Sequence, residues 1–110
     1  MKVKSYEELV AWQKAMLLAK MVYGIQEQLS KEELYGLGDQ IRRAVVSVPS
    51  NIAEGMSRLS DKEKVHFMEI SYGSLMEVLC QMEISKELNY VTEEQMKDIE
   101  NQITIIAKQL

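Results

Sequence analysis

The sequence predicts an all-α protein, an antiparallel up-down four-helix bundle in which residues 1–110 form a single domain. Four Ser or Thr residues are each followed three positions later by Glu or Gln, the spacing of the capping box that begins a helix. After each of these pairs, apolar residues recur every three or four positions, and no segment alternates as a strand would. The connections between the helical segments are short, which favours antiparallel neighbours.

The first predicted helix spans about residues 6–29 and follows the capping pair Ser5 and Glu8. It carries two apolar stripes side by side. The first consists of Leu9, Trp12, Met16, Ala19 and Tyr23, and the second of Val10, Leu17 and Met21. A helix of a small bundle needs one apolar stripe of about 100° to cover its core-facing side. The first helix therefore has more apolar surface than a monomeric bundle requires.

The second predicted helix spans about residues 31–58, begins at the pair Ser30 and Glu33, and contains the only proline, Pro49. Its stripe consists of Leu34, Leu37, Ile41, Ala44, Val48 and Ile52. A proline inside a helix removes one hydrogen bond and costs about 3 kcal/mol. Because the apolar period continues through Pro49, we predict a continuous helix that is kinked there. The kink either only curves the helix around the core or also shapes a partner surface.

The third helix is predicted over about residues 61–88, after Ser60 and Glu63, and the fourth over about 93–109, after Thr92 and Gln95. The third carries two stripes, Val65, Met68, Tyr72, Leu75, Leu79 and Met82, and Phe67, Ile70, Ser74 and Val78; the fourth has one, Met96, Ile99, Ile103, Ile106 and Leu110. The surplus stripes of the first and third helices predict self-association through these helices. The alternative is a core that is simply broad.

The residues that carry catalytic chemistry are sparse. The only histidine, His66, forms a Glu-x-x-His pair with Glu63, but a di-iron bundle needs two such pairs and two further glutamates. The only cysteine, Cys80, stands in the middle of a helix and is expected to be a small buried side chain. Glu69 and Glu77 lie two turns apart on one helix face, where they either act as an acid–base pair or, as is usual for such carboxylates, are simply solvated. We therefore predict no enzymatic activity, no metal and no cofactor.

Charge limits the partners. The net charge is −4, and it is distributed as +1 over residues 1–29, zero over 30–59, −3 over 60–90 and −2 over 91–110. Nucleic-acid binding relies on Lys and Arg, so an acidic chain is a poor general candidate. Arg42, Arg43 and Arg58 are still candidate contacts to phosphate or to a partner. Alternatively, they pair with carboxylates such as Asp39 or Glu54 and fix the packing.

Five short motifs follow one another along the chain: Trp12-Gln13-Lys14-Ala15, Glu33-Leu34-Tyr35-Gly36-Leu37, Gln40-Ile41-Arg42-Arg43-Ala44, Pro49-Ser50-Asn51-Ile52-Ala53-Glu54-Gly55 and Gly73-Ser74-Leu75. In this order they resemble a bacterial family of four-helix-bundle proteins, first noted as products of intervening sequences in 23S ribosomal RNA genes, over about residues 5–110. The resemblance implies a homopentamer with no attributed enzymatic activity. A relative of that family, the accessory variability protein of diversity-generating retroelements, is a basic pentamer that binds a reverse transcriptase and nucleic acid.

These observations lead to a non-enzymatic oligomeric scaffold or adaptor that binds copies of itself and a protein, RNA or DNA partner. We expect Trp12, Pro49, Gly73 and Ser74 to lie in oligomer contacts or helix packing, the latter two as small residues that permit close helix approach. The alternative is a nucleic-acid-binding accessory protein that acts with a reverse transcriptase or ribosomal RNA. No apolar run approaches the roughly 18 residues that span a membrane, and the N-terminus lacks a signal core, so a cytoplasmic location is expected.

Overall fold

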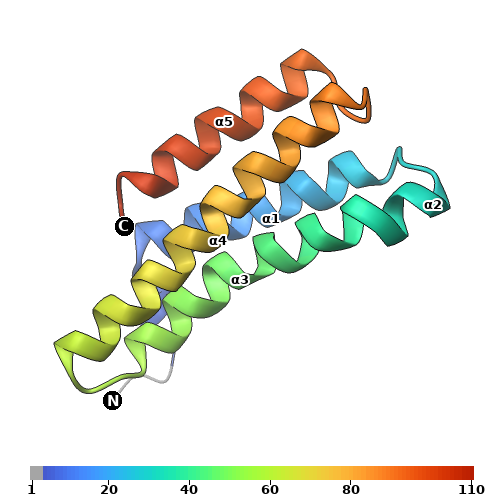
Figure 1. Ribbon diagram of the computed structural model, residues 1–110. Helices are drawn as coiled ribbons and strands as arrows, with labels where there is room; N and C mark the ends of the chain where they lie inside the picture. Colours follow the sequence, from blue (N-terminus) through green and yellow to red (C-terminus); the bar gives the residue numbers. More distant parts are fainter. Residues whose placement is uncertain (1–3) are drawn as a thin grey trace.

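The computed structural model describes residues 4–110, and within them four long helices form a bundle (Figure 1). They are α1 (Val10–Gln26), α3 (Asp39–Met56), α4 (Asp61–Glu87) and α5 (Glu93–Ala107). A 3₁₀ turn, η1 (Ser5–Glu8), precedes α1, and the short α2 (Lys31–Glu33) and the π-helical turn η2 (Leu34–Gly38) lead into α3. The predicted all-α bundle is thereby confirmed.

The four helices pack as two neighbouring pairs. Both α1 and α4 contact α3 on one side and α5 on the other, and the α3–α4 contact is the most extensive. The bundle measures 45 × 24 × 21 Å along its principal axes. The hairpin of α3 and α4 reaches beyond the C-terminal end of α5 (Figure 1). The first turns of α4 therefore lack a covering helix on the side of α5.

The core receives apolar side chains from all four helices, and the fourth predicted helix supplies them as expected. Met96, Ile99, Ile103 and Ile106 are buried, and Leu110 packs at the edge of the core. On α3 the buried apolar residues are Ile41, Ala44, Val45, Val48, Pro49 and Ile52. For these two helices the predicted stripe agrees with the buried face.

The first helix buries a different face from the two that its periodicity predicts. Its buried residues are Ala11, Ala15, Leu18, Val22 and Gln26, and they belong to neither predicted stripe. The two predicted stripes flank this face, and Met16 and Leu17 are exposed. Three apolar faces share the same helical period, so periodicity cannot choose among them. Two alanines make the buried face narrow, which allows neighbouring helices to approach closely.

The third helix also departs from its predicted stripes. Leu75, Val78 and Met82 are buried as expected, whereas Val65 and Tyr72 are exposed. Three polar residues, Ser71, Gln81 and Ser85, fill the remaining buried positions of α4. The Ser71 hydroxyl donates a hydrogen bond to the Val48 carbonyl at 2.8 Å, and that of Ser85 donates to the Gln81 carbonyl at 3.0 Å. Satisfied hydroxyls thus occupy positions where the apolar period predicts larger side chains.

Three of the four predicted helix starts are formed. The boxes at Ser30 and Thr92 are complete, with both reciprocal hydrogen bonds, and the Ser60 hydroxyl accepts the Glu63 amide at 3.1 Å. The box predicted at Ser5 is wrong, because residues Ser5–Glu8 form the 3₁₀ turn η1. Leu9 then adopts an extended conformation, and α1 begins at Val10 without a side-chain cap. The extended residue separates the serine from the helix that it was expected to cap.

The second predicted helix is continuous through Pro49, as expected, and Pro49 lies inside α3. The backbone leaves helical geometry earlier, at Gly36 in η2, where φ is −87° and ψ is −112°. Nearby Gly38 is buried, and a Cβ there would lie 2.9 Å from the Glu33 carbonyl oxygen. Glycine at position 38 is therefore required by close packing. A bend at Pro49 itself stays a prediction.

Candidate interaction surfaces

Arg42 joins the end of α1 to the start of α3. Its Nη1 donates to the Gln26 side-chain oxygen at 2.6 Å, and its Nη2 donates to the Leu34 carbonyl at 3.0 Å. The buried Gln26 also donates from Nε2 to the Gly38 carbonyl at 2.9 Å. Only 23% of the Arg42 side chain is exposed, and Asp39 lies 3.6 Å from its Nη2. These contacts give Arg42 a structural role inside the chain, and the sequence pattern did not single out its partner Gln26.

The other two candidate arginines form ion pairs with carboxylates of α3. Arg43 is 81% exposed, and its Nε donates to an Asp39 carboxylate oxygen at 3.2 Å. Arg58 donates to the Glu54 carboxylate at 2.5 Å, and its guanidinium lies 4.7 Å from the centre of the Phe67 ring. The three arginines therefore do not form one cluster of free cations. Arg43 alone among them presents most of its side chain to solvent.

The Pro-Ser-Asn-Ile-Ala-Glu-Gly motif is explained largely by the packing of α3 against its neighbours. The Asn51 amide donates to the carbonyl and the hydroxyl of Ser47, at 2.8 and 2.9 Å. The Ser47 hydroxyl in turn lies 2.7 Å from that of Ser74 on α4. At Gly55 an added Cβ would lie 2.9 Å from Met68 Cε and 3.0 Å from Phe67 Cβ. The motif thus holds α4 close to α3.

Pro49 contributes to a surface between α1 and α3, which we call the Trp12 face. It is a shallow hollow of about 360 Å³ lined by Tyr6, Trp12, Met16, Ala19, Val46, Pro49, Ser50 and Ala53. The Tyr6 and Trp12 rings lie 5.2 Å apart, while Met16 and Val46 are 37% and 44% exposed. None of the lining side chains is charged. Trp12 and Pro49, which the sequence placed in oligomer contacts or packing, therefore share one apolar surface.

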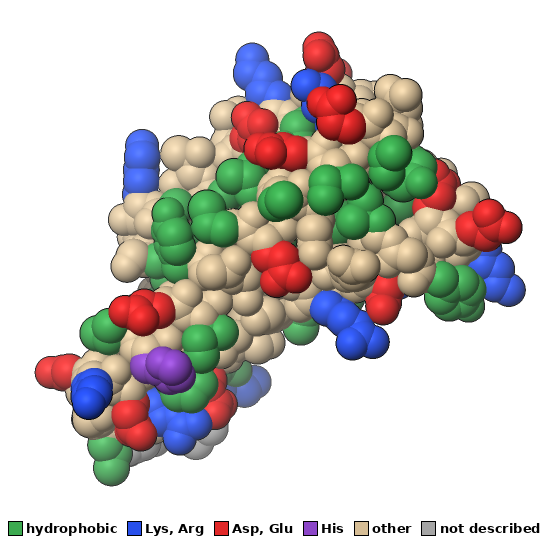
Figure 2. All heavy atoms as spheres, viewed as in Figure 1, with side chains coloured by type: hydrophobic (Ala, Val, Ile, Leu, Met, Phe, Trp, Pro, Cys, Tyr) green, Lys and Arg blue, Asp and Glu red, His purple; other side chains and the backbone are tan. Residues whose placement is uncertain are grey.

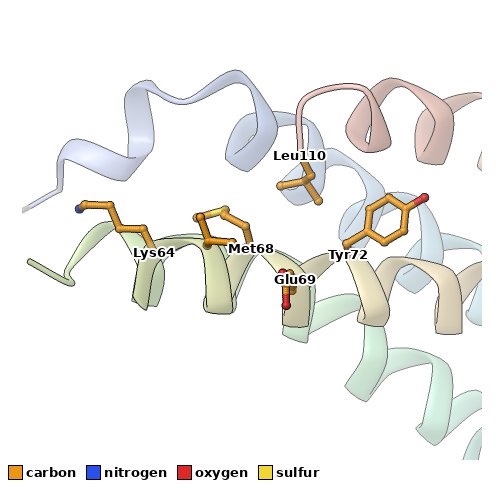
Figure 3. A pocket seen from close by; sticks show the side chains of 6 residues that line it. Lys64, Met68, Glu69, Tyr72 and Leu110 are labelled. Carbon is orange, nitrogen blue, oxygen red and sulfur yellow. The ribbon is translucent and has the colours of Figure 1, made fainter. Parts of the chain in front are cut away.

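A second hollow lies where the α3–α4 hairpin projects past α5, and we call it the C-terminal pocket. It has a volume of about 540 Å³ and is lined by Lys64, Val65, Met68, Glu69, Tyr72 and Leu110. Figure 3 shows Met68 and Tyr72 rising from α4 on either side of Leu110, with Glu69 turned away. The lining contains one lysine and one glutamate, so its net charge is zero. This pocket uses the apolar stripe of α4 that the core leaves exposed.

Gly73 and Ser74 separate in the structure. Ser74 is half-buried against α3 through its contact with Ser47. Gly73 is exposed, and no described atom of another element lies within 4 Å of the position of an added Cβ. Within the described chain, close helix approach is therefore a role of Gly55 and not of Gly73, whereas Gly38 is enclosed by the Glu33 carbonyl of its own segment. Burial and backbone contacts, which a sequence does not display, distinguish these glycines.

The candidates for chemistry remain isolated. His66 is exposed on α4 and packs edge-on against the Phe67 ring, with the ring centres 5.4 Å apart. Among residues 4–110 no group of three His, Cys, Asp or Glu side chains is placed to hold a metal ion. Cys80 is exposed, contrary to the buried position expected for it. Every helix in the described part of the chain is too short or too polar to cross a membrane.

Comparisons with known proteins identify a family by its sequence model and a solved structure by its fold. The family model of the 23S rRNA-intervening sequence protein matches residues 7–110. A solved structure with the same fold is a protein of unknown function from the S23 ribosomal protein family of Bacteroides thetaiotaomicron VPI-5482. It superposes with a TM-score of 0.81 at 24% identity, over 90% of this chain and 93% of that chain. A comparison with curated proteins gives no match.

Proposed function

Because the chain belongs to the 23S rRNA-intervening sequence protein family, a family of unknown function, we propose that it acts without catalysis as a self-assembling helical scaffold in the bacterial cytoplasm. In this proposal the subunits associate through exposed apolar faces. The assembled ring, of five subunits as the family resemblance implies, presents its remaining surface to a partner.

The observation that carries the proposal is the distribution of exposed apolar side chains. Thirteen large hydrophobic side chains are exposed within residues 4–110, and eight of them lie on α1 or α4. The Trp12 face alone places Met16 of α1 beside Val46 of α3, around a half-buried tryptophan. Full burial of such a side chain contributes about 1.5–3 kcal/mol. Contiguous apolar surface of this kind marks interaction sites on soluble proteins.

The partner that this proposal favours is a protein, in preference to RNA or DNA. Nucleic-acid affinity rests on cations that are free to neutralise phosphates. Arg42 and Arg58 already donate to groups of their own chain, and Arg43 pairs with Asp39. The net charge of −4 adds repulsion. Fluorescence anisotropy with labelled single-stranded RNA over a salt series tests this choice, and tight binding that weakens steeply with salt would support the nucleic-acid alternative.

Sedimentation equilibrium over a range of micromolar concentrations tests the assembly. We expect a mass several times that of one chain, and five times if the family resemblance holds. Met16→Glu and Val46→Glu each place a carboxylate on the Trp12 face, so both should lower the association constant at least tenfold. Asn101→Glu is the matched control, because residue 101 is exposed on α5 away from this face. A protein that remains monomeric at every concentration would refute the proposal.

Trp12 supplies a second measurement, since it is the only tryptophan of the chain. If the Trp12 face is buried between subunits, its fluorescence emission should shift to shorter wavelength as the mass rises. An increase in mass without a shift would place the subunit contact elsewhere, on α4 or at the C-terminal pocket.

A further inference from the structure

The far half of the α4–α5 hairpin carries a groove that the core does not use. Its exposed apolar side chains are Cys80, Ile84 and Leu88, its lining also includes Met96, which is buried in the core, and its volume is about 560 Å³. Ile84 and Leu88 are 42% and 51% exposed, so half of each side chain faces water. Figure 2 shows hydrophobic side chains in a row over α4 and α5, with acidic side chains on both sides of the row. An apolar floor of this kind accommodates apolar side chains of a partner.

The rim of this groove is acidic along both helices. Glu83 and Glu87 line it from α4, and Glu100 lines it from α5. The one lysine in the lining, Lys86, lies 3.6 Å from Glu93 of α5 and is thus already paired. The C-terminal pocket has balanced charge, and the Trp12 face has none. The α4–α5 groove therefore combines an apolar floor with an uncompensated negative rim.

We propose that the α4–α5 groove binds a basic amphipathic helix of a partner protein. This inference rests on the proposed scaffold function and names the class of partner that the scaffold takes. Such a helix places apolar side chains at positions i, i+3 or i+4 and i+7 on the floor, over Ile84 and Leu88. Its Lys and Arg side chains flank that stripe and meet Glu83 and Glu87 on one side and Glu100 on the other.

The rim also explains why the occupant is a basic helix and not another ligand. Nucleic acid would bring its phosphates against three glutamates, and an acidic or neutral helix would leave those carboxylates without partners. The apolar floor disfavours a fully charged, extended peptide, because it would leave Ile84 and Leu88 uncovered. Charge complementarity and the apolar floor together select a helix with both features.

The probe is a labelled peptide of about 14 residues, four helical turns, with Leu on one face and Lys flanking it. Fluorescence anisotropy gives its dissociation constant for the full chain. We expect the triple variant Glu83→Gln, Glu87→Gln and Glu100→Gln to weaken binding about tenfold, since each exposed charge pair contributes modestly. The control variant Glu27→Gln and Glu32→Gln removes exposed acids away from the groove and so also makes the net charge less negative. Beyond this effect of net charge, which it shares with the groove variant, it should change the affinity for the peptide less than twofold.

Cys80 reports occupancy at the groove itself, because it is exposed and is the only cysteine. The bound peptide should slow alkylation of Cys80 by N-ethylmaleimide at least fivefold. A peptide of identical composition with its Leu and Lys positions shuffled should neither protect Cys80 nor bind within tenfold of the amphipathic peptide.

Three results would overturn the proposal. The first is equal affinity of the groove variant and the control, and the second is binding that leaves Cys80 unprotected. The third is a combination: Ile84→Glu changes the mass of the assembly, and the wild-type chain does not bind the peptide. The groove would then be a contact between copies of this chain. The affinity and alkylation readouts do not require that the chain assembles, so a monomer that binds the peptide refutes the scaffold and leaves the groove proposal standing.

Discussion

Replacing Gly55, in the last turn of α3, or Gly73, in the middle of α4, by alanine is the same chemical change, and the structure predicts opposite effects on stability. At Gly73 no described atom of another element lies within 4 Å of the new methyl group. At Gly55 the methyl group would lie 2.9 Å from Met68 Cε, 3.0 Å from Phe67 Cβ and 3.4 Å from the Lys64 carbonyl oxygen. The methyl group is free in one site and enclosed by α4 in the other.

The magnitudes follow from two opposing terms. Alanine in place of glycine stabilises a helix interior by about 1 kcal/mol, and Gly73→Ala should show this gain. At Gly55, in the last turn of α3, the helical gain is at most as large, and it is offset by overpacking, which typically costs about 1–3 kcal/mol. The Met68 methyl group can rotate away, but Phe67 Cβ is fixed to the α4 backbone, so the helices must separate by a few tenths of an ångström. We expect Gly55→Ala to lose about 1 kcal/mol, and hence a difference of about 2 kcal/mol between the two variants.

Urea unfolding followed by far-UV circular dichroism measures both variants against the wild type. All three proteins must be compared at one protein concentration, because assembly would make the midpoint depend on concentration. A variant Gly55→Val, with a larger side chain, should be less stable than Gly55→Ala. If Gly55→Ala stabilises the protein as much as Gly73→Ala does, the conclusion that Gly55 sets the α3–α4 spacing is wrong.

Four further substitutions test polar contacts between the helices and at the start of α5. Arg42→Met should lower the free energy of unfolding by about 2 kcal/mol, because it removes the donors to Gln26 and Leu34. Arg43→Met should change it by less than about 0.5 kcal/mol. Equal urea midpoints for the two variants would contradict this assignment. Ser71→Ala should cost about 1 kcal/mol and lower the melting temperature by about 4 °C, since the fully buried hydroxyl donates to the Val48 carbonyl. Thr92→Ala should cost about 1 kcal/mol and speed amide exchange in the first turn of α5, and unchanged exchange there would show that the capping box contributes little.

The core of α3 and α5 could be predicted from the sequence because each has a single dominant apolar stripe. The seam from Met96 to Ile106 has no competitor, so its burial follows from periodicity alone. On α1 the same rule fails, since Leu9, Val10 and Ala11 each begin an apolar face with helical spacing. The choice of the face with Ala11 and Ala15 depends on how closely α3 and α5 approach, which is a property of the assembled bundle.

Of the interaction surfaces, the sequence could predict only that some helices carry more apolar residues than the core needs. The sequence indicates that α1 and α4 carry more apolar residues than a core requires, and it places Trp12 and Pro49 in contacts. It does not show that these two residues line one hollow, because they come from different helices. Gln26 carries no periodic or motif signal, and its role depends on the carbonyl of Gly38 and the guanidinium of Arg42.

By itself the sequence determined the number of helices, three of their four starts, the continuity of the helix through Pro49 and the family. Each of these depends on interactions between residues close along the chain, such as a serine and the amide three positions later. Only the tertiary structure decided which face of α1 is buried, which glycines permit close contact and which arginines remain available to solvent. These outcomes depend on distances between helices, and such distances are fixed only when all four helices pack together.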